Sequence, residues 1–314
     1  MKGLHLVFDG TNTAYRANVV TDLSTKQGVR TSAIVGTLNI LHSTAEYLMK
    51  QYDLPVKEMI LAWDKGHSPR RKELFPEYKA GRKKEWTPED DQFRREFFEQ
   101  IDALHNNLKY FGVKSIMVNH WEGDDLIFGV TEKLSKTCPE DLSVVISTDE
   151  DFHQLVSPKV HIFSPIKKIL YTDENYQELM GIPYEYFLTY KILKGDSSDG
   201  IPGIIGIGDK TAKSLVKTYG DIDGLFEHKE ELLKSKRTAK IFTFEGLSTL
   251  DRNNKLINLR DYVDLTPVNE ELTMLLNSNL TVDKKKCREF LMKYQLVDLL
   301  MKFQNWIQLF EECN

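Results

Sequence analysis

The sequence is poor in cysteine. It contains three in 314 residues, Cys138, Cys287 and Cys313, which are widely separated. Neither the C-x₂-C spacing of a zinc site nor the density of a disulfide framework is present. We therefore expect three ordinary reduced thiols.

Long apolar runs are also missing. The first run, Leu4–Phe8, is far too short for the apolar region of a signal peptide, and no later segment approaches membrane-spanning length. We therefore expect a cytoplasmic protein. With 41% hydrophobic and 28% charged residues, the chain can bury one large core plus a smaller attached helical unit.

An overall excess of positive charge is absent as well. The net charge of −5 counts against nucleic-acid binding, because domains that bind nucleic acids usually carry an excess of Lys and Arg. The average hides a local asymmetry, since residues 65–84 hold eight basic side chains against two acidic ones. The basic ones are Lys65, Arg70, Arg71, Lys72, Lys79, Arg82, Lys83 and Lys84.

Five short runs rich in Val, Ile and Leu predict buried strands, and helix-like stretches lie between most of them. This alternation is typical of a parallel α/β fold. The predicted strands are Leu4–Phe8, Met59–Trp63, Lys114–Val118, Ser143–Ile146 and Val160–Phe163. Four of them lead directly or within a few residues to carboxylates, namely Asp9, Asp64, Glu122, Asp124, Asp125, Asp149 and Asp151. Since ligands of open parallel sheets bind at the carboxyl ends of the strands, we expect these seven acids to converge.

A cluster of seven carboxylates requires cations. Each acid alone has an ordinary interpretation as a helix cap or turn residue, but together they would repel one another and raise their pKa values. No His or Cys accompanies them at ligand spacing, and His153, next to Phe152, is expected to pack. An oxygen ligand set suits Mg²⁺ or Mn²⁺ better than Zn²⁺. Two such ions about 4 Å apart can activate water and stabilise the leaving oxygen in phosphodiester hydrolysis.

A glycine-rich turn follows two further acids, Asp196 and Asp199. Gly203, Gly206 and Gly208 precede a predicted helix over residues 209–219, and Lys210 and Thr211 begin that helix. Backbone N–H groups in such a turn can approach a phosphate, as in a helix-hairpin-helix that holds a DNA backbone. An ordinary loop before a helix is the alternative, and the adjoining acids favour the DNA-binding interpretation.

The basic segment 65–84 contains Pro69, Pro76 and Gly81, so it should not form one continuous helix. A solvated surface loop is the usual interpretation of such a stretch. Its position after the strand that ends near Asp64 instead places it at the mouth of the acidic crevice. We expect Arg70, Arg71 and Lys83 to bind substrate phosphates there. The aromatic residues of this region, Phe75, Tyr78 and Trp86, offer faces on which a base can stack.

From about residue 4 to residue 265, the chain resembles the 5′ nucleases, which include bacteriophage flap endonucleases and the 5′-nuclease domain of bacterial DNA polymerase I. The resemblance rests on ordered blocks. These are Asp9-Gly10-Thr11-Asn12, Trp63-Asp64, Tyr78-Lys79-Ala80-Gly81-Arg82, Glu122-Gly123-Asp124-Asp125, Ser147-Thr148-Asp149-Glu150-Asp151 and Gly195 through Ala212. The departures from the family pattern at Gly123, Thr148, Glu150, Gly200 and Asp209 remove none of the proposed ligands.

The resemblance implies a PIN-like, mostly parallel sheet flanked by helices, with a helical arch and a helix-3-turn-helix. It implies that nine acids bind metal, some of them through water, namely Asp9, Asp64, Glu122, Asp124, Asp125, Asp149, Asp151, Asp196 and Asp199. It also implies that Lys79 and Arg82 engage the scissile phosphate beside Tyr78, and that the turn at 203–208 can bind K⁺. The expected parts are a nuclease core over 1–185 with the arch at about 65–100, a DNA-binding region over 186–265 and a helical tail over 266–314.

These observations predict a monomeric, Mg²⁺-dependent nuclease that cuts branched or 5′-flapped DNA, or RNA–DNA hybrids, near a 5′ end and leaves 5′-phosphates. Its task would be primer or flap removal during replication, in a bacterium or a phage-infected cell. Two alternatives remain open, a non-catalytic protein that binds branched DNA and a PIN-like ribonuclease. The apolar residues of the tail predict amphipathic helices packed on the core. Alternatively, residues 306–310 would dock on a replication protein.

Overall fold

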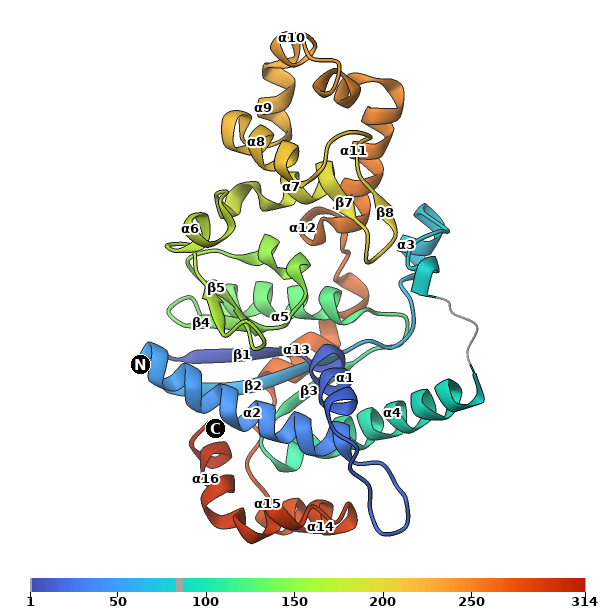
Figure 1. Cartoon of the computed structure of the whole chain (residues 1–314). Helices are drawn as coiled ribbons and strands as arrows, with labels where there is room; N and C mark the ends of the chain where they lie inside the picture. The colour runs from blue at the N-terminus through green and yellow to red at the C-terminus, as the bar shows by residue number, and fades with distance from the viewer. Residues whose placement is uncertain (1, 83–86, 314) are drawn as a thin grey trace.

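A mixed sheet lies at the centre of the computed structural model, which describes residues 2–82 and 87–313 (Figure 1). In this part of the chain the sheet has six strands in the order β3-β2-β1-β4-β5-β6. Neighbouring strands from β3 to β5 run parallel, and β6 pairs antiparallel with β5. The strands are β1 (Leu4–Asp9), β2 (Val56–Trp63), β3 (Lys114–Met117), β4 (Leu142–Ile146), β5 (Val160–Ser164) and β6 (Ile169–Tyr171). The predicted parallel α/β fold is therefore confirmed, and β6 was missed.

Both faces of the sheet are buried, which explains why its central strands are continuous apolar runs. Leu4, Leu6 and Phe8 of β1 belong to one hydrophobic cluster, together with residues of α2 and α4. Val7 points to the other face and belongs to the cluster that contains α5. The helices of these two layers are α1 (Gly10–Val20), α2 (Ser32–Tyr52), α4 (Pro88–Asn107), α5 (Gly123–Thr137) and α6 (Tyr176–Met180).

The basic segment is broken into short pieces, as its prolines predict. Ser68 caps α3 (Pro69–Leu74), with Pro69 in the first turn, where its missing N–H costs nothing. A 3-10 helix, η1 (Ala80–Arg82), follows, and α4 begins with a capping box formed by Thr87 and Asp90. Residues Lys83 and Trp86, to which roles were assigned above, lie outside the described residues, as does the link between η1 and α4.

A helical unit stands above the sheet in Figure 1. It contains a two-stranded ribbon between α7 and α8, and the predicted helix over 209–219 is confirmed as α8. Its elements are α7 (Phe187–Lys194), β7 (Gly195–Asp196), β8 (Ile201–Pro202), α8 (Asp209–Tyr219), α9 (Ile222–Glu227), α10 (Lys229–Leu232), α11 (Phe244–Ile257) and α12 (Leu259–Tyr262). Further 3-10 helices are η2 (Leu108–Tyr110), η3 (Glu150–Leu155), η4 (Tyr184–Tyr186), η5 (Thr238–Phe242) and η6 (Thr266–Val268).

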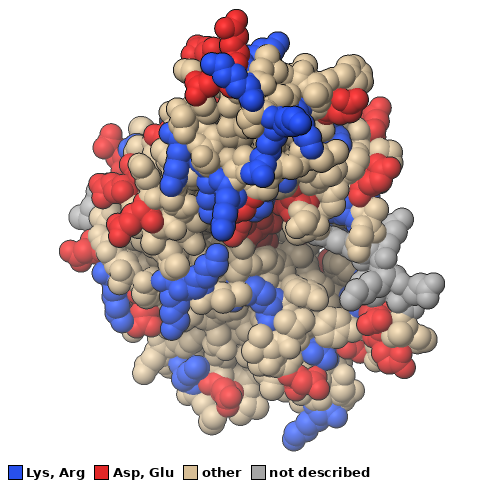
Figure 2. Space-filling view, turned by 45° about the horizontal axis from the view of Figure 1, so that its top comes forward, with Lys and Arg blue, Asp and Glu red and all other residues tan. Residues whose placement is uncertain are grey.

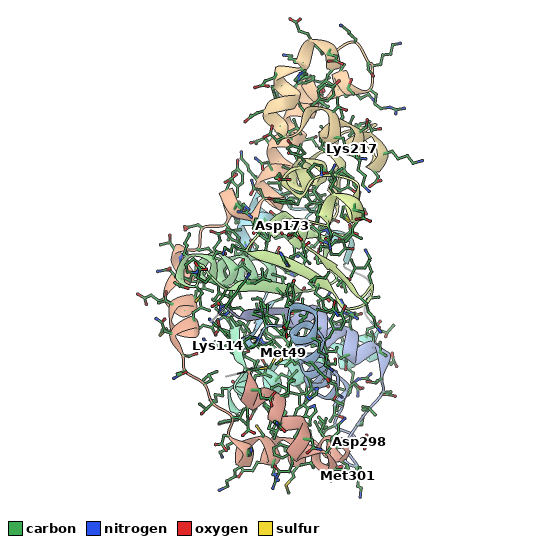
Figure 3. The ribbon with its side chains drawn as sticks, turned by 90° about the vertical axis from the view of Figure 1, so that its left-hand side faces the viewer. Met49, Lys114, Asp173, Lys217, Asp298 and Met301 are labelled. Atoms are coloured by element: carbon green, nitrogen blue, oxygen red, sulfur yellow. The ribbon has the colours of Figure 1, made fainter. Side chains whose placement is uncertain are left out.

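The C-terminal helices cover the opposite end of the molecule. Figure 3 places Lys217 of α8 at one end and Asp298 and Met301 at the other. Trp306, Ile307 and Phe310 are at most 4% exposed and pack in the cluster of α2 and α4. The predicted packing of the tail is therefore confirmed, and these apolar side chains are not available for docking. The helices at this end are α14 (Lys284–Lys293), α15 (Val297–Met301) and α16 (Phe303–Glu312), whereas α13 (Asn269–Asn277) packs against β3 and α5.

Two smaller expectations also hold. The three cysteines are free, and Cys287 and Cys313 are buried. His153 is buried among the rings of Tyr171, Tyr176 and Phe187, which agrees with a packing role. Among the described residues, none of the helices is both long enough and apolar enough to cross a membrane.

The packing of α16 predicts a large loss of stability when Phe310 is truncated. Phe310 is fully buried and contacts the rings of Phe111 and Trp306. Phe310→Ala should lower the free energy of unfolding by about 3–5 kcal/mol, measured by urea denaturation. Gln308→Ala, on the exposed face of the same helix, should change it by less than about 0.5 kcal/mol. Equal effects of the two substitutions would contradict the packing of this helix.

Candidate active site

The acids predicted at the strand ends lie along one edge of the sheet. Asp9 ends β1 and caps α1, with Oδ1 accepting from Asn12 N at 3.0 Å and Oδ2 from the Ser147 hydroxyl at 2.8 Å. Asp64 follows β2 and accepts from Gly123 N at 2.6 Å, which joins it to the first turn of α5. Figure 2 shows acidic side chains inside a central hollow, with Lys and Arg side chains above it and to its left.

Arg71 lies among the acids of α5 and is only 1% exposed. Its Nη1 donates to Glu122 Oε2 at 2.8 Å, and its Nη2 donates to Asp125 Oδ1 at 2.8 Å. Nη2 also contacts Asp124 at 3.2 Å, and Nε donates to the carbonyl of Leu256 in α11. The guanidinium is therefore a buried counter-ion for three carboxylates. It does not face solvent, as a free DNA contact would.

Arg70, next to it, has a different environment. It is partly buried, and its Nη1 donates to the carbonyl of Lys255 at 2.7 Å, while its Nη2 is buried without a hydrogen-bond partner. The Arg70 side chain therefore joins α3 to α11. Its predicted role in binding substrate remains a prediction.

Lys79 and Tyr78 converge on Glu122. Lys79 Nζ lies 3.0 Å from Glu122 Oε2 and 3.8 Å from Asp199 Oδ2, and the Tyr78 hydroxyl donates to Glu122 Oε2 at 2.9 Å. Lys79 adopts a left-handed φ of 55°, and its N–H donates to the carbonyl of Asp199. Such a backbone costs free energy and persists only where surrounding contacts fix it. Tyr78 is 2% exposed, so its ring is not an open stacking face in this structure.

The remaining predicted acids gather around Lys191, a buried lysine of α7. Its Nζ lies 2.6 Å from both Asp151 Oδ1 and Asp196 Oδ2. Asp196 Oδ1 accepts from the N–H groups of Ser198 and Asp199, which fixes the turn between β7 and β8. Asp149 accepts from Asp151 N at 2.9 Å. Lys191 therefore joins the helical unit to the acids that follow β4.

The raised pKa values of four acids indicate that the nearby side-chain cations do not fully offset their burial and mutual repulsion. Burial, followed by repulsion from Asp64, raises the pKa of Asp9 to about 7. Burial and neighbouring carboxylates raise the pKa of Asp125 and Asp151 to about 7 and that of Asp149 to about 6. Glu122 differs, because the cations of Arg71 and Lys79 outweigh its burial and lower its pKa to about 2.

This donor set fits a divalent cation that prefers oxygen. The predicted ligands all offer carboxylate oxygens, and a cation would relieve the repulsion that raises their pKa values. Within residues 2–82 and 87–313, no three of these acids bring ligand atoms within 4.8 Å of one another. Arg71, Lys79 and Lys191 lie between them instead. The acids are gathered at one edge, but their final coordination geometry is not formed.

The glycines of the turn serve two different structural purposes. A Cβ at Gly203 would lie 2.1 Å from the carbonyl oxygen of Lys194, so this glycine permits the close approach of β8 to α7. Gly206, with φ of 89°, and Gly208, the N-cap of α8, are exposed. Gly208 has no side chain to cap the first N–H groups of α8, which leaves them available to an anion.

Cations surround this turn. Lys210 is exposed at the start of α8, and Thr211 accepts a weak hydrogen bond from Arg237 at 3.5 Å. A Cβ built on Gly206 would lie 3.7 Å from Lys240 Nζ and 3.8 Å from Arg237 Cγ. Arg237 and Lys240, like Lys191, were missed in the sequence, because the fold alone brings them to the turn and to the acids. Arg82 lies in η1, and its side chain is outside the described residues.

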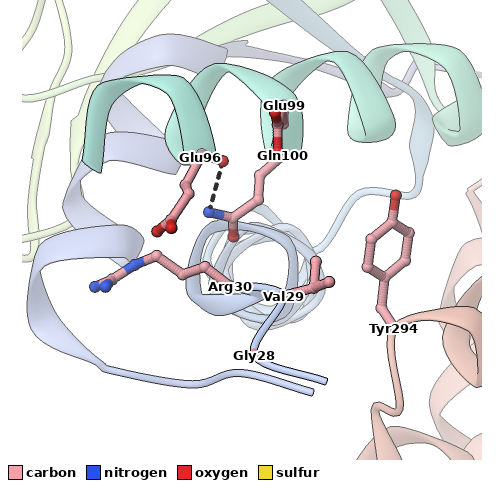
Figure 4. A pocket seen from close by; sticks show the side chains of 7 residues that line it. All are labelled: Gly28, Val29, Arg30, Glu96, Glu99, Gln100 and Tyr294. Atoms are coloured by element: carbon pink, nitrogen blue, oxygen red, sulfur yellow. Dashed lines mark hydrogen bonds between the residues drawn. The ribbon is translucent and has the colours of Figure 1, made fainter. Parts of the chain in front are cut away.

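Two pockets differ in their chemistry. One of about 410 Å³ is lined by Asp149, Lys191 and Asp196, among others, and opens on the acids. A second, of about 250 Å³, lies where the segment 28–30 meets α4 and Tyr294 (Figure 4). Gln100 Nε2 donates there to the carbonyl of Glu96 at 3.1 Å. None of the predicted site residues lines this second pocket, so the first is the candidate active site.

Two family models match the chain in succession. Residues 4–181 match the N-terminal resolvase-like domain of the 5′-3′ exonucleases, and residues 182–279 match their C-terminal SAM fold. The chain belongs to the 5′-3′ exonuclease family. The resemblance to the 5′ nucleases and the predicted PIN-like α/β fold are thereby confirmed.

The relatives include a protein of similar length and a much longer one. The chain is 29% identical over 301 residues to a 5′-3′ exonuclease of Aquifex aeolicus, with 95% of this chain and 96% of that protein covered. It is 29% identical over 265 residues to DNA polymerase I of Lactococcus lactis, covering 81% of this chain but only 28% of the polymerase. The chain thus spans less than a third of the length of that relative.

A solved structure shares the fold. It is a bacteriophage T5 flap endonuclease, described as a pseudo-enzyme-product complex with DNA and metal ions. The TM-score is 0.66 at 22% identity, with 93% of this chain and 99% of that chain covered. At this identity the likeness concerns the fold alone.

The contacts of Arg71 predict a large effect on stability without metal. Arg71→Ala removes the cation from buried Asp125 and partly exposed Asp124 and leaves Glu122 with Lys79 alone. It should cost about 3–5 kcal/mol in EDTA, measured by urea unfolding. Arg71→Lys keeps one positive charge and should cost less. Arg95→Ala, on the exposed face of α4, is the control and should be nearly neutral. A small effect of Arg71→Ala in EDTA would show that the acids are compensated in another way.

The raised pKa values predict how stability depends on pH. Asp9, Asp125 and Asp151 have pKa values of about 7 in the fold against 3.8 ordinarily, so the folded chain holds protons that the unfolded chain has released. Their contribution to stability is full below about pH 4 and is lost as the pH rises to about 7. In EDTA, Asp9→Asn should therefore reduce the fall in Tm between pH 5 and pH 8. An unchanged or steeper fall in the variant would refute the raised pKa of Asp9.

Proposed function

We propose that this chain is a structure-specific 5′ nuclease that hydrolyses phosphodiester bonds near 5′ ends and junctions of branched DNA. The observation that carries the proposal is the position of the acids between two cationic features. Lys79 lies on one side of Glu122, and the glycine-rich turn with Lys210 belongs to the helical unit that Lys191 joins to the acids. A duplex held at the turn would bring its strand end to the acids.

We propose Mg²⁺ as the cofactor, with Mn²⁺ able to substitute. The residues that would hold it are Asp9, Asp64, Glu122, Asp124, Asp125, Asp149, Asp151, Asp196 and Asp199, some of them through water. Bound there, the metal supplies an activated water and stabilises the leaving oxygen. The raised pKa values of Asp9 and Asp151 support this assignment, since a bound cation would favour the ionised form of these carboxyls at neutral pH.

Lys79 is proposed to engage the scissile phosphate, together with Arg82. The Lys79 ammonium contacts Glu122, and 15% of the side chain is exposed, which supports the approach of a phosphate. Its contact with Glu122 keeps it in position until substrate arrives. Neutralising charge that develops on the phosphate lowers the barrier. Water would add to phosphorus and the bond between phosphorus and the 3′ oxygen would break, which yields a 5′-phosphate and a 3′-hydroxyl.

The helical unit is proposed to grip the duplex. The free N–H groups at the start of α8, with Lys210 and Thr211, suit a phosphate and carry no base information. The turn around Gly206 would accommodate K⁺ through its carbonyl groups. The proposed parts are therefore a nuclease core over 1–185, a DNA-binding region over 186–265 and a tail over 266–314. We propose action on flaps or RNA primers during replication, in the cytoplasm of a bacterium or a phage-infected cell.

The decisive experiment uses a DNA flap labelled at its 5′ end. With Mg²⁺ the protein should cut near the junction, EDTA should abolish the cut, and Asp149→Asn should lose it while keeping the fold by circular dichroism. Ligation of the downstream product without a kinase would confirm its 5′-phosphate. Tight binding without cleavage in Mg²⁺ or Mn²⁺ would instead identify a binding protein, and cleavage confined to single-stranded RNA would identify a ribonuclease.

Lys79 and Lys210 should affect different steps. Lys79→Ala should lower the single-turnover rate at saturating protein by about 10²–10³-fold, because it removes charge stabilisation at the reacting phosphate. Lys210→Ala should leave that rate nearly unchanged, weaken flap binding and reduce the dependence of log Kd on log salt by about one. A single-turnover rate unaffected by Lys79→Ala would remove this residue from the mechanism.

A further inference from the structure

A second group of ligand-type side chains lies at the opposite ends of the strands. His5 is near the start of β1, Asp141 directly precedes β4, and Cys138 is the C-cap of α5. One ligand atom from each lies within 4.8 Å of the other two. His5 and Asp141 are buried, and Cys138 is partly exposed.

The hydrogen bonds of His5 resemble those of a metal ligand. In the tautomer that carries its proton on Nδ1, this nitrogen donates to Glu58 Oε1 at 2.6 Å. Its Nε2 then faces Asp141 Oδ2 at 3.1 Å. A lone pair opposite a carboxylate oxygen is repulsive, so a proton or a metal ion has to lie between them. A carboxylate on the far nitrogen is the usual partner of a histidine that binds zinc.

Cys138 favours a metal ion over a proton. It adds a third ligand atom within 4.8 Å, which an ion pair between His5 and Asp141 does not require, and a thiolate is a strong ligand for zinc. Ligand atoms around a tetrahedral zinc ion are about 3–4 Å apart, given metal–ligand distances of about 2.0–2.3 Å. The three atoms lie within 4.8 Å of one another, so they would move closer together on binding.

We propose that His5 Nε2, Cys138 Sγ and Asp141 Oδ2 form a zinc site, distinct from the acids at the other end of the sheet. The fourth position would be taken by water. Binding replaces one proton on His5 and one on Cys138 by Zn²⁺, so the net charge of the group is unchanged. The sequence showed no zinc spacing, because His5 is 133 positions from Cys138 and only the sheet brings them together.

Lys57 is the internal competitor for this site. Its Nζ lies 2.7 Å from Asp141 Oδ2, but its side chain is 40% exposed and can turn into solvent. The ion would connect the N-terminal ends of β1 and β4 with the C-terminal end of α5. The other ends of β1 and α5 carry Asp9 and Asp124, so zinc would stabilise the placement of the elements that hold the proposed active site. This inference does not depend on the proposed nuclease activity.

Cobalt reports on the site directly. The full chain, freed of metal by a chelator and dialysed, should bind Co²⁺ with a thiolate-to-cobalt charge-transfer band. Carboxylate ligands alone give no such band, so Co²⁺ at the acids does not interfere. One equivalent of Zn²⁺ should bleach the band. If the charge-transfer band is absent at saturating Co²⁺, the proposal is wrong, and these residues form only a network of ion pairs.

Matched variants test each contact. Cys138→Ser should abolish the band, whereas Cys313→Ser, at a buried cysteine outside the proposed ligand set, should keep it. Glu58→Gln should weaken Zn²⁺ binding about 10- to 100-fold. Lys57→Met should strengthen Zn²⁺ binding, because it removes the competing ammonium. A band that persists in Cys138→Ser, or Zn²⁺ binding weakened by Lys57→Met, would contradict the proposed ligand set.

Discussion

The constraint on which the rest of the structure depends is the compensation of buried negative charge at the carboxyl ends of the strands. Arg71, Lys79 and Lys191 each place one cation between two or three carboxylates. A buried carboxylate without a partner would cost several kcal/mol, so these contacts determine where α3, η1 and α7 can lie. The basic segment folds against the acids because Arg71 and Lys79 offset their negative charge. Arg71 also donates a hydrogen bond to the carbonyl of Leu256, which holds α11 beside the same group.

This arrangement links the basic segment, the first turn of α5 and the helical unit through the site itself. Arg71 belongs to α3, its partners to α5, and Lys191 joins the helical unit to the acids that follow β4. Binding of a divalent cation would weaken these contacts, since the metal and the side-chain cations compete for the same oxygens.

The sequence predicted the sheet well because its strands are buried on both faces and read as apolar runs. It predicted the acids because the carboxyl ends of parallel strands share one edge. It did not predict β6, whose three residues follow a tight turn. It also assigned Arg71 to DNA binding, whereas Arg71 contacts Glu122 in the structure, and it missed Lys191. The sequence does not distinguish buried from exposed basic residues, and the fold does. Gly203 was read as a phosphate contact, whereas the structure gives it a packing reason, the close approach to Lys194.

Two buried acids near opposite ends of β1 differ in their supply of positive charge. Asp141 directly precedes β4, beside the N-terminal end of β1. Burial opposes ionisation of Asp141, but hydrogen bonds from Lys57, Gly3 and His5 lower its pKa below the ordinary value. Asp9 lies at the C-terminal end of β1, where burial and repulsion from Asp64 raise its pKa to about 7. The residue type is the same at both places, so the difference lies in the neighbouring charges. Acids that the side-chain cations compensate only in part favour an external divalent cation, and such a cation would attract a phosphate.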